Sequence, residues 1–278
     1  MIDLHCHILP DLDDGVRTMD DALEMARVAE EEGVEKIVAT PHLFRDNFNW
    51  GDFAVIEEKR QALAEAISSQ NIRLDILPGA EVHLSHNLMN TVRKNRKHLV
   101  LNRSSYMFIE FPSSHIFAGV KKLFFELMAE GIRPIIAHPE RNLVFIQNPV
   151  LLFELVQMGS LAQANTGSFL GLYGDHAERA VSHFLELNLV HFIATDGHSP
   201  RSLSSRMKEA AGKAEALIGK ERAQALINEN PHAVISDREI PSFFPPVNPK
   251  EKERSYSIKI PSIFRRKKPG SAEGHKRP

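Results

Sequence analysis

The 278-residue chain contains one cysteine, Cys6, so it forms no internal disulfide bond, and a cytoplasmic location is the simplest expectation. Residues 1–15 carry two histidines and four aspartates, a composition that argues against a secretory signal peptide, and no apolar run approaches the length of a membrane span. Neither G-x-x-x-x-G-K-S/T nor G-x-G-x-x-G occurs, so nucleotide binding through those phosphate loops has no support.

A strong excess of charge of one sign is also missing, because 34 basic and 36 acidic side chains leave a formal net charge of −2. The balance is uneven: residues 247–278 contain ten basic and three acidic residues, so the remainder of the chain is acidic. An acidic body argues against a nucleic-acid partner. The basic stretch IFRRKK at 263–268 leaves open a weak contact with anionic lipid, although a solvated tail is the simpler interpretation.

Short apolar runs alternate with helical patterns along the chain. Seven runs are expected to form strands: 1–5, 34–40, 74–82, 106–111, 132–138, 161–166 and 190–195. Apolar residues at helical spacing predict helices over 18–32, 53–69, 174–188, 201–218 and 220–228. The alternation predicts an α/β fold, either a parallel barrel or a doubly wound sheet. We expect one domain over 1–240 and a Pro-rich, basic, disordered tail over 241–278.

Metal-type side chains follow nearly every predicted strand at its carboxyl end. They are His5, His7, Asp14, His42, Glu81, Glu110, His138, Asp196 and His198. In a βα barrel these strand ends form one face, and that face carries the chemistry. Because side chains alternate along a strand, His5 and His7 point the same way and Cys6 points the other way. Asp3 points to the same side of the strand as His5, and it is expected to orient the His5 ring without binding the metal itself.

A single buried histidine is usually a hydrogen-bonded core residue, but nine such residues at equivalent strand ends make a purely structural explanation improbable. Mixed histidine and carboxylate ligands suit manganese, iron or zinc, and their number favours two or three adjacent ions. Arg141 follows His138 by three residues, and an arginine beside a multi-metal site points to phosphoester hydrolysis. The Cys-x5-Arg loop of cysteine-dependent tyrosine phosphatases is absent, since Leu12 occupies the arginine position, so Cys6 is interpreted as a packing residue.

Seven ordered motifs, DLHCHILPDLDDG, ATPH, GAEVH, IEFP, AHPER, NTGS and ATDGH, resemble the polymerase-and-histidinol-phosphatase (PHP) superfamily over residues 1–235. Within it, the chain is most similar to bacterial metal-dependent tyrosine-protein phosphatases of capsule and exopolysaccharide synthesis. The resemblance implies a distorted seven-stranded (β/α) TIM-like barrel, the PHP fold, with a cluster of three ions, usually Mn2+. It implies one ion on His5, His7, Glu81 and Asp196, a second on Glu81, Glu110 and His138, and a third on Asp14, His42 and His198.

The resemblance also assigns the substrate contacts. Arg141 and Arg201 would bind the phosphate, with Arg206 as the alternative to Arg201, and Asp14 is a candidate proton donor. The implied substrate is a phosphotyrosine-containing protein, a membrane-associated bacterial tyrosine kinase. Three rivals stay open at this point: a small-molecule phosphatase such as one for histidinol phosphate, a metal-dependent phosphodiesterase, and a regulatory protein without catalysis. The sequence also leaves homo-oligomerisation open.

Overall fold

The computed structural model describes residues 1–45, 52–200, 206–241 and 244–251. Its strands are β1 (Ile2–Cys6), β2 (Lys36–Ala39), β3 (His42–Leu43), β4 (Asp75–Pro78), β5 (Glu81–His83), β6 (Tyr106–Glu110), β7 (Arg133–Ala137), β8 (Leu161–Asn165) and β9 (Phe192–Ala194). All their pairings are parallel. They form a three-stranded sheet in the order β1-β2-β4 and a six-stranded sheet in the order β3-β5-β6-β7-β8-β9.

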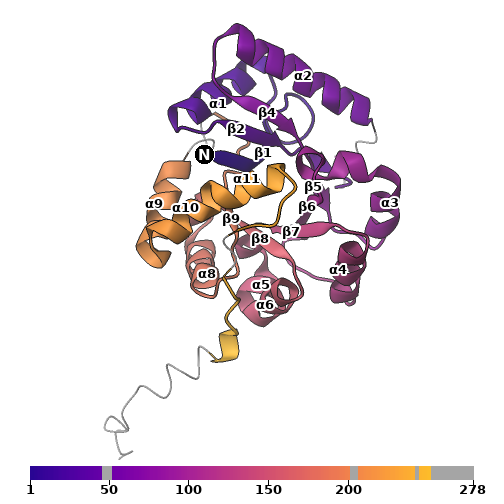
Figure 1. Cartoon of the computed structure of the whole chain (residues 1–278), viewed down its shortest axis with the longest axis vertical. Coiled ribbons are helices and arrows are strands. Elements are labelled where there is room, and N and C mark those ends of the chain that lie inside the picture. The colour runs from indigo at the N-terminus through magenta and orange to yellow at the C-terminus, as the bar shows by residue number, and fades with distance from the viewer. Residues whose placement is uncertain (46–51, 201–205, 242–243, 252–278) are drawn as a thin grey trace, which may run out of the picture.

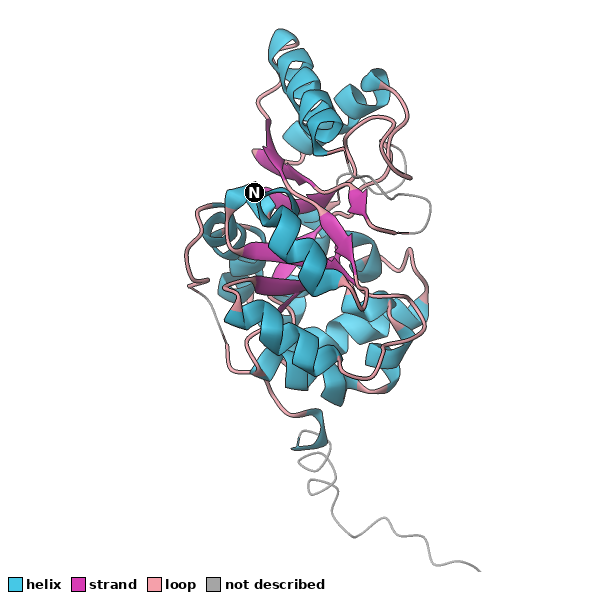
Figure 2. Ribbon diagram, turned by 90° about the vertical axis from the view of Figure 1, so that its right-hand side faces the viewer, coloured by secondary structure: helices cyan, strands magenta, loops and turns pink. Residues whose placement is uncertain are grey.

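Helices surround these sheets, as the two ribbon views show (Figure 1, Figure 2). They are α1 (Met19–Glu31), α2 (Phe53–Ser69), α3 (Leu88–Leu99), α4 (Val120–Ala129), α5 (Leu143–Gln147), α6 (Pro149–Gln157), α7 (Thr166–Phe169), α8 (Asp175–Glu186), α9 (Met207–Ile218), α10 (Lys220–Ile227) and α11 (Glu229–Ile235). Two 3-10 turns, η1 (Leu101–Arg103) and η2 (Pro139–Arg141), precede β6 and follow β7. Within the described ranges, no helix is both long enough and apolar enough to cross a membrane.

The two sheets meet where β1 runs beside the segment that follows β9. The backbone N–H of His7 donates to the carbonyl of Gly197 at 2.9 Å, and the N–H of Asp196 donates to the carbonyl of His5 at 2.8 Å. This contact is an isolated bridge between Cys6 and Gly197 rather than a continuous ladder. The prediction of a parallel α/β fold is confirmed, whereas the hydrogen bonds of the described residues define two sheets and not a closed seven-stranded barrel.

One predicted strand is broken in the structure. The run 74–82 forms β4 and β5, with the break at Gly79 and Ala80. A Cβ atom on Gly79 would lie 2.5 Å from Cγ1 of Val38, so glycine is needed where the chain crosses β2. A similar break at Thr40 and Pro41 separates β2 from β3, which the sequence does not predict. Both breaks occur just before a residue of the predicted metal site.

The predicted helices over 18–32, 53–69, 174–188 and 220–228 are confirmed as α1, α2, α8 and α10. The Thr18 hydroxyl accepts from the N–H of Asp21 at the start of α1, and Asp52 accepts from Ala54 and Val55 at the start of α2. Among the described helices, the sequence misses α3, α4, α5, α6, α7 and α11. The start of the predicted helix 201–218 and most of the tail over 241–278 lie outside the described residues.

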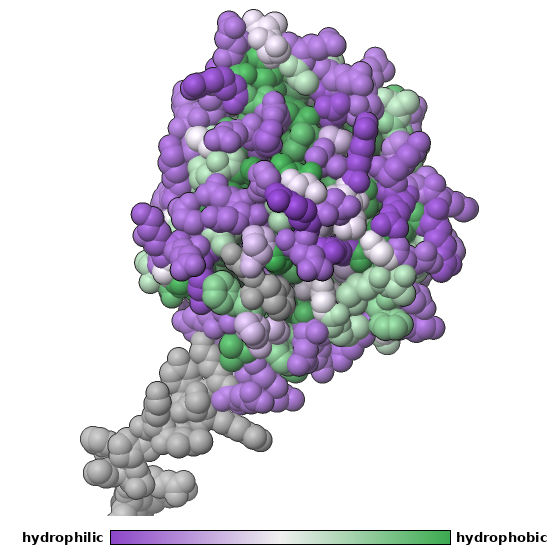
Figure 3. All heavy atoms as spheres, viewed as in Figure 1, coloured by the Kyte–Doolittle hydropathy of each residue, from purple (hydrophilic) through white to green (hydrophobic). Residues whose placement is uncertain are grey.

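Apolar side chains fill the spaces on both sides of the sheets. A large buried cluster lies between the strands and the surrounding helices. A second cluster lies on the other side of the strands and includes Leu4, Phe108, Ile135 and Phe192, all with no exposed surface. Hydrophilic side chains dominate the face drawn in Figure 3. The Phe108 ring lies 4.8 Å from the His5 ring, so the apolar interior forms the floor of the predicted metal site.

Candidate metal centre

The nine predicted ligands gather in one cluster at the carboxyl ends of the strands. On β1, Nε2 of His5 and Nε2 of His7 lie 3.3 Å apart, and both side chains are fully buried. Two imidazole nitrogens at this separation either share a proton or offer lone pairs to a common cation. The alternation of the strand therefore places the H-x-H pair as the sequence predicts.

Two buried carboxylates lie among the imidazoles. One oxygen of Glu81 is 2.8 Å from Nδ1 of His42, 3.4 Å from Nε2 of His5 and 3.5 Å from Nε2 of His7. The other oxygen is 3.0 Å from Nε2 of His138. Asp196, which follows β9, faces the same two nitrogens as Glu81. Its Oδ1 lies 3.4 Å from Nε2 of His5 and 3.3 Å from Nε2 of His7.

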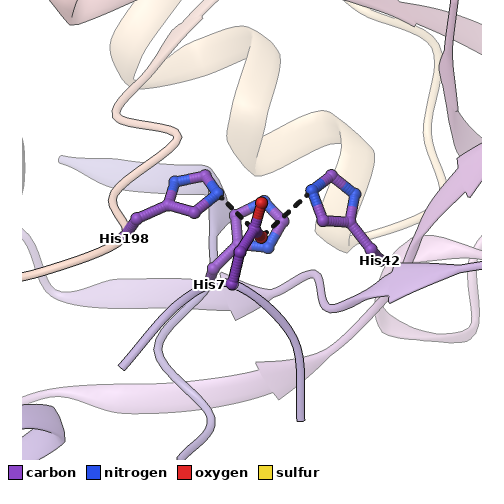
Figure 4. A group of neighbouring side chains, drawn as sticks. His7, His42 and His198 are labelled. Atoms are coloured by element: carbon purple, nitrogen blue, oxygen red, sulfur yellow. Dashed lines mark ion pairs between the residues drawn. The ribbon is translucent and has the colours of Figure 1, made fainter. Parts of the chain in front are cut away.

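Asp14 lies at the outer edge of the cluster, between two histidines. Its Oδ1 is 3.4 Å from Nε2 of His42 and 3.3 Å from Nε2 of His198. The rings of His7 and His198 stack with their centroids 4.0 Å apart. Figure 4 shows His42 and His198 approaching from opposite sides of His7, with dashed lines to a shared oxygen. Glu110 completes the set, with Oε2 at 3.7 Å from Nδ1 of His42.

The donor set fits divalent cations. Three groups have ligand atoms within 4.8 Å of one another: His7 with Asp14, His42 and His198; His5 with His7 and Glu81; and His42 with Glu81 and Glu110. Oε2 of Glu81 is buried and accepts no hydrogen bond from the described residues, which suits a metal ligand. Nitrogen and oxygen donors together match manganese, iron or zinc.

The backbone is strained at two of these residues. His138 has φ 32° and Asp196 has φ 50°, values that side-chain-bearing residues seldom adopt. His138 lies between β7 and η2, and Asp196 follows β9. Unfavourable backbone conformations concentrate at functional sites, where the surrounding structure holds them in place. The strain thus falls on the two strand ends that deliver a histidine and a carboxylate to the cluster.

Two residues on the side away from the cluster orient the His5 and His7 rings. The Gln163 carbonyl oxygen lies 3.0 Å from Nδ1 of His5, and Asp13 Oδ2 lies 2.7 Å from Nδ1 of His7. Asp3 does not bind the imidazole of His5, contrary to the prediction. Its carboxylate accepts from the backbone N–H of His5 and from the N–H and hydroxyl of Thr195, so it fixes the backbone where the sheets meet.

Gly15 permits the tight loop that brings Asp13 and Asp14 to the site. The Gly15 N–H donates to Oδ1 of Asp13 at 3.0 Å, and the Val16 N–H donates to the carbonyl of His7. A Cβ atom on Gly15 would lie 2.2 Å from that carbonyl oxygen. Only glycine therefore fits at this close approach of the loop to β1.

The pKa shifts of three groups indicate which of them are charged at neutral pH. Burial lowers the pKa of His42, but Asp14 and Glu81 outweigh it and raise the pKa to about 9. Burial raises the pKa of Asp14, but hydrogen bonds from His198 and His42 hold it well below its usual value. Asp14 is therefore ionised at neutral pH, which favours the role of ligand over that of proton donor. Burial raises the pKa of Cys6, so its thiol stays protonated and packs as expected.

Arg141 lies at the rim of the cluster. Its Nη1 donates to Oδ2 of Asp196 at 2.8 Å, and its side chain is 37% exposed. Arg201 lies outside the described residues, and the alternative Arg206 is exposed at the start of α9.

Arg45 is a further arginine that the sequence does not predict here. Its Nη1 is 2.6 Å from Nε2 of His42 and 3.2 Å from Oε1 of Glu110.

Sequence reasoning missed residues that hold the ligands rather than act as ligands. They are Asp13, Gln163 and Arg45, which contact His7, His5 and His42. Tyr173, which contacts Arg141 and no ligand, was also missed. His83 lies 3.1 Å from Oε2 of Glu110 through Nδ1. Gln163 carried a usable signal, because it lies on a predicted strand and shares one side of that strand with Asn165 at its carboxyl end. Asp13 is adjacent to the predicted ligand Asp14, but it lies in a loop whose conformation the sequence does not fix. Arg45 and Tyr173 lie in loops, where spacing gives no direction to a side chain.

Comparison with known proteins identifies relatives over almost the whole chain. Residues 1–236 match the family model described as capsular polysaccharide synthesis, CpsB/CapC. Tyrosine-protein phosphatase YwqE of Bacillus subtilis is 34% identical over 258 residues, covering 93% of this chain and 100% of the relative. The putative tyrosine-protein phosphatase CapC of Staphylococcus aureus is 33% identical over 253 residues, covering 91% and 98%.

Solved structures agree with these relatives. One, from work on YwqE of Bacillus subtilis and CpsB of Streptococcus pneumoniae, described as unique metal-dependent tyrosine phosphatases, has a TM-score of 0.84 and 35% identity, and covers 89% of this chain and 99% of that one. A histidinol phosphate phosphatase of Lactococcus lactis shares the fold alone, at a TM-score of 0.50 and 14% identity over 80% and 93% of the two chains. The predicted resemblance and enzyme class are confirmed at the level of the family, and the chain belongs to the CpsB/CapC family of capsular polysaccharide synthesis.

Proposed function

We propose that this protein is a metal-dependent protein-tyrosine phosphatase that acts in the regulation of capsular or extracellular polysaccharide synthesis. One observation carries the proposal: two buried carboxylates, Glu81 and Asp196, lie among imidazole nitrogens with Arg141 at the rim. Buried carboxylates that face the same imidazole nitrogens are stabilised by a positive charge, which a bound cation would supply, and the arginine supplies an anion-binding group beside them. The tyrosine phosphatase relatives support the choice of substrate.

The proposed ligands are the nine residues of the cluster. We assign one ion to His5, His7, Glu81 and Asp196, a second to Glu81, Glu110 and His138, and a third to Asp14, His42 and His198. Manganese is the proposed metal, with iron or zinc as alternatives that the same donors accept. Divalent ions in such a site supply a water of lowered pKa and neutralise the charge of phosphoryl oxygens.

The remaining steps depend on the side chains of this chain. Arg141 presents the N–H groups that Asp196 does not use toward phosphoryl oxygens, and Arg201 is the proposed second arginine. Gln163 and Asp13 hold the rings of His5 and His7 in fixed tautomers. A tyrosine leaving group has a pKa of about 10, so it needs less protonation than an alkoxide.

The proposed architecture is a distorted PHP barrel. It has seven strands if β2 with β3, and β4 with β5, are each counted as one bent strand. The Cys6–Gly197 bridge supports closure between β1 and the segment after β9. We propose a cytoplasmic enzyme, supported by the single buried thiol. Its proposed substrate is a phosphotyrosine-containing protein, a bacterial tyrosine kinase at the membrane.

Turnover of three substrates by the manganese-loaded protein tests the function. A phosphotyrosine peptide tests the proposed activity, histidinol phosphate tests the small-molecule rival, and bis-p-nitrophenyl phosphate tests the phosphodiesterase rival. The proposal predicts the highest kcat/KM on the peptide and loss of that turnover in chelator. Preference for either rival substrate, or peptide turnover that persists without metal, would overturn it.

A further inference from the structure

Tyr173 covers the arginine at the rim of the metal centre. It lies in the loop between α7 and α8, and Cζ of Arg141 lies over its ring at 4.2 Å from the centroid. Gly171 and Gly174 flank this loop with φ values of 73° and 82°, which other residues rarely adopt. The loop therefore has a defined shape that presents the Tyr173 ring to the guanidinium.

The Arg141 side chain under this ring shares its acceptor with Asn165 at the end of β8. Asn165 Nδ2 donates to Oδ2 of Asp196 at 2.6 Å, and Arg141 Nη1 donates to the same oxygen at 2.8 Å. Tyr173 thus covers one of the two side chains that donate to this carboxylate oxygen. Burial raises the pKa of the Tyr173 hydroxyl to about 12, so the ring stays neutral beside the arginine at physiological pH.

An arginine side chain is flexible, and its guanidinium needs a fixed plane to bind two phosphoryl oxygens at once. Arg141 receives one such restraint from Asp196 at its Nη1. A ring stacked on its face supplies the second restraint, because it leaves the in-plane N–H groups free to bind. A flat aromatic cover on one face and a carboxylate at one edge together define the direction in which the other N–H groups point.

On this basis, and resting on the proposed phosphatase function, we propose that Tyr173 is a positioning residue for the reaction. It acts by fixing the guanidinium of Arg141 for the phosphoryl group. Removing the ring should then weaken the binding of every ligand that carries a phosphoryl group, whatever its leaving group. A direct contact between Tyr173 and the tyrosine ring of the substrate would instead affect only aromatic phosphate esters.

The test compares Tyr173→Leu and Tyr173→Phe with the original protein, all loaded with manganese. The measurements are kcat and KM for a phosphotyrosine peptide and the inhibition constant of inorganic phosphate. Tyr173→Leu removes the ring and should raise both KM and the phosphate inhibition constant by about tenfold. Tyr173→Phe keeps the ring and loses only the hydroxyl, so it should retain most of the phosphate affinity.

Leu172→Ala is the matched control, because Leu172 is 45% exposed in the same loop. It should leave KM and the phosphate inhibition constant within twofold of the original values, roughly the scatter expected of a neutral surface change. A raised KM with an unchanged phosphate constant would assign Tyr173 to the substrate ring and overturn the proposal. Unchanged values in Tyr173→Leu would overturn it too. Failure of the original protein to hydrolyse any phosphate ester would refute the phosphatase function instead.

Discussion

Nδ1 of His7 lies 2.7 Å from Oδ2 of Asp13, and the same carboxylate oxygen accepts the backbone N–H of His42 at 2.9 Å. One carboxylate thus orients two proposed ligands without facing the cluster itself. Burial raises the pKa of Asp13, but His7 outweighs it and lowers the pKa, so Asp13 stays ionised. We expect Asp13→Asn to weaken metal binding by about 10–100-fold, since the amide orients the ring poorly.

Asp11→Asn is the control for this change, because Asp11 lies in the same loop and is 74% exposed at its side chain. Titration with manganese, followed by calorimetry, should give nearly the original affinity for this variant. Equal affinities for Asp13→Asn and Asp11→Asn would refute the orienting role.

His138→Ala should reduce phosphatase turnover by more than about a hundredfold, because removing a metal ligand should cost more than removing a residue that only orients a ligand. The fold should persist, since His138 lies just after β7, outside the strand, and its ring contacts the cluster through Glu81. Circular dichroism and turnover of the phosphotyrosine peptide check both expectations. His115→Ala, which changes an exposed histidine, serves as the control. Near-normal turnover in His138→Ala with metal bound would contradict the ligand assignment.

Removing the metal should destabilise the protein as well as stop turnover. Binding at a hundred times Kd stabilises a folded protein by about 2.7 kcal/mol, which is a shift of roughly 5–10 °C in Tm for a chain of this size. Thermal unfolding in chelator and in manganese measures the difference. Asp196→Asn should show a much smaller shift, because it loses a central carboxylate. The same Tm in both buffers for the original protein would argue against a buried ion.

His191 should make stability depend on acid pH independently of the metal. Burial lowers its pKa to about 3, against about 6.5 when unfolded, so its contribution to stability is present above pH 6.5 and is lost as pH falls. The loss approaches about 1.4 kcal/mol per pH unit. His191→Asn keeps an acceptor for the N–H of Ala162, and its stability should fall less steeply between pH 6 and about 4. Urea unfolding of metal-free protein across this range tests it, and parallel slopes would refute it.

The sequence predicts most of the strands because most are short apolar runs, and β1, β6, β8 and β9 are buried along their whole length. It misses α3 and α4 for different reasons. In α3, polar residues dominate, and burial of Leu88, Met89, Val92 and Leu99 by the rest of the fold decides the helix. In α4, Phe125 is 64% exposed, so apolar residues occur on more than one face and hide the helical period. Tertiary packing overrides local pattern in both.

The candidate metal centre is predictable to the extent that the proposed ligands interrupt apolar strands at their ends. The sequence cannot decide between the adjacent carboxylates Asp13 and Asp14, because the loop conformation alone turns one toward the cluster and the other toward His7. The sequence also predicts the wrong residue as the one that orients the His5 ring. Asp3 has the right spacing, but its carboxylate is used where the two sheets meet, and Gln163 reaches the ring from a strand distant in sequence.

Gly15 gives the centre a weak point that no ligand mutation would reveal. Any side chain there would push against the His7 carbonyl oxygen and force the loop off β1. Asp13 and Asp14 would move together, so one remote substitution would disturb an orienting group and a ligand at the same time. An alanine at this position would leave all nine proposed ligands chemically intact, yet the chain would lose the geometry that brings them together.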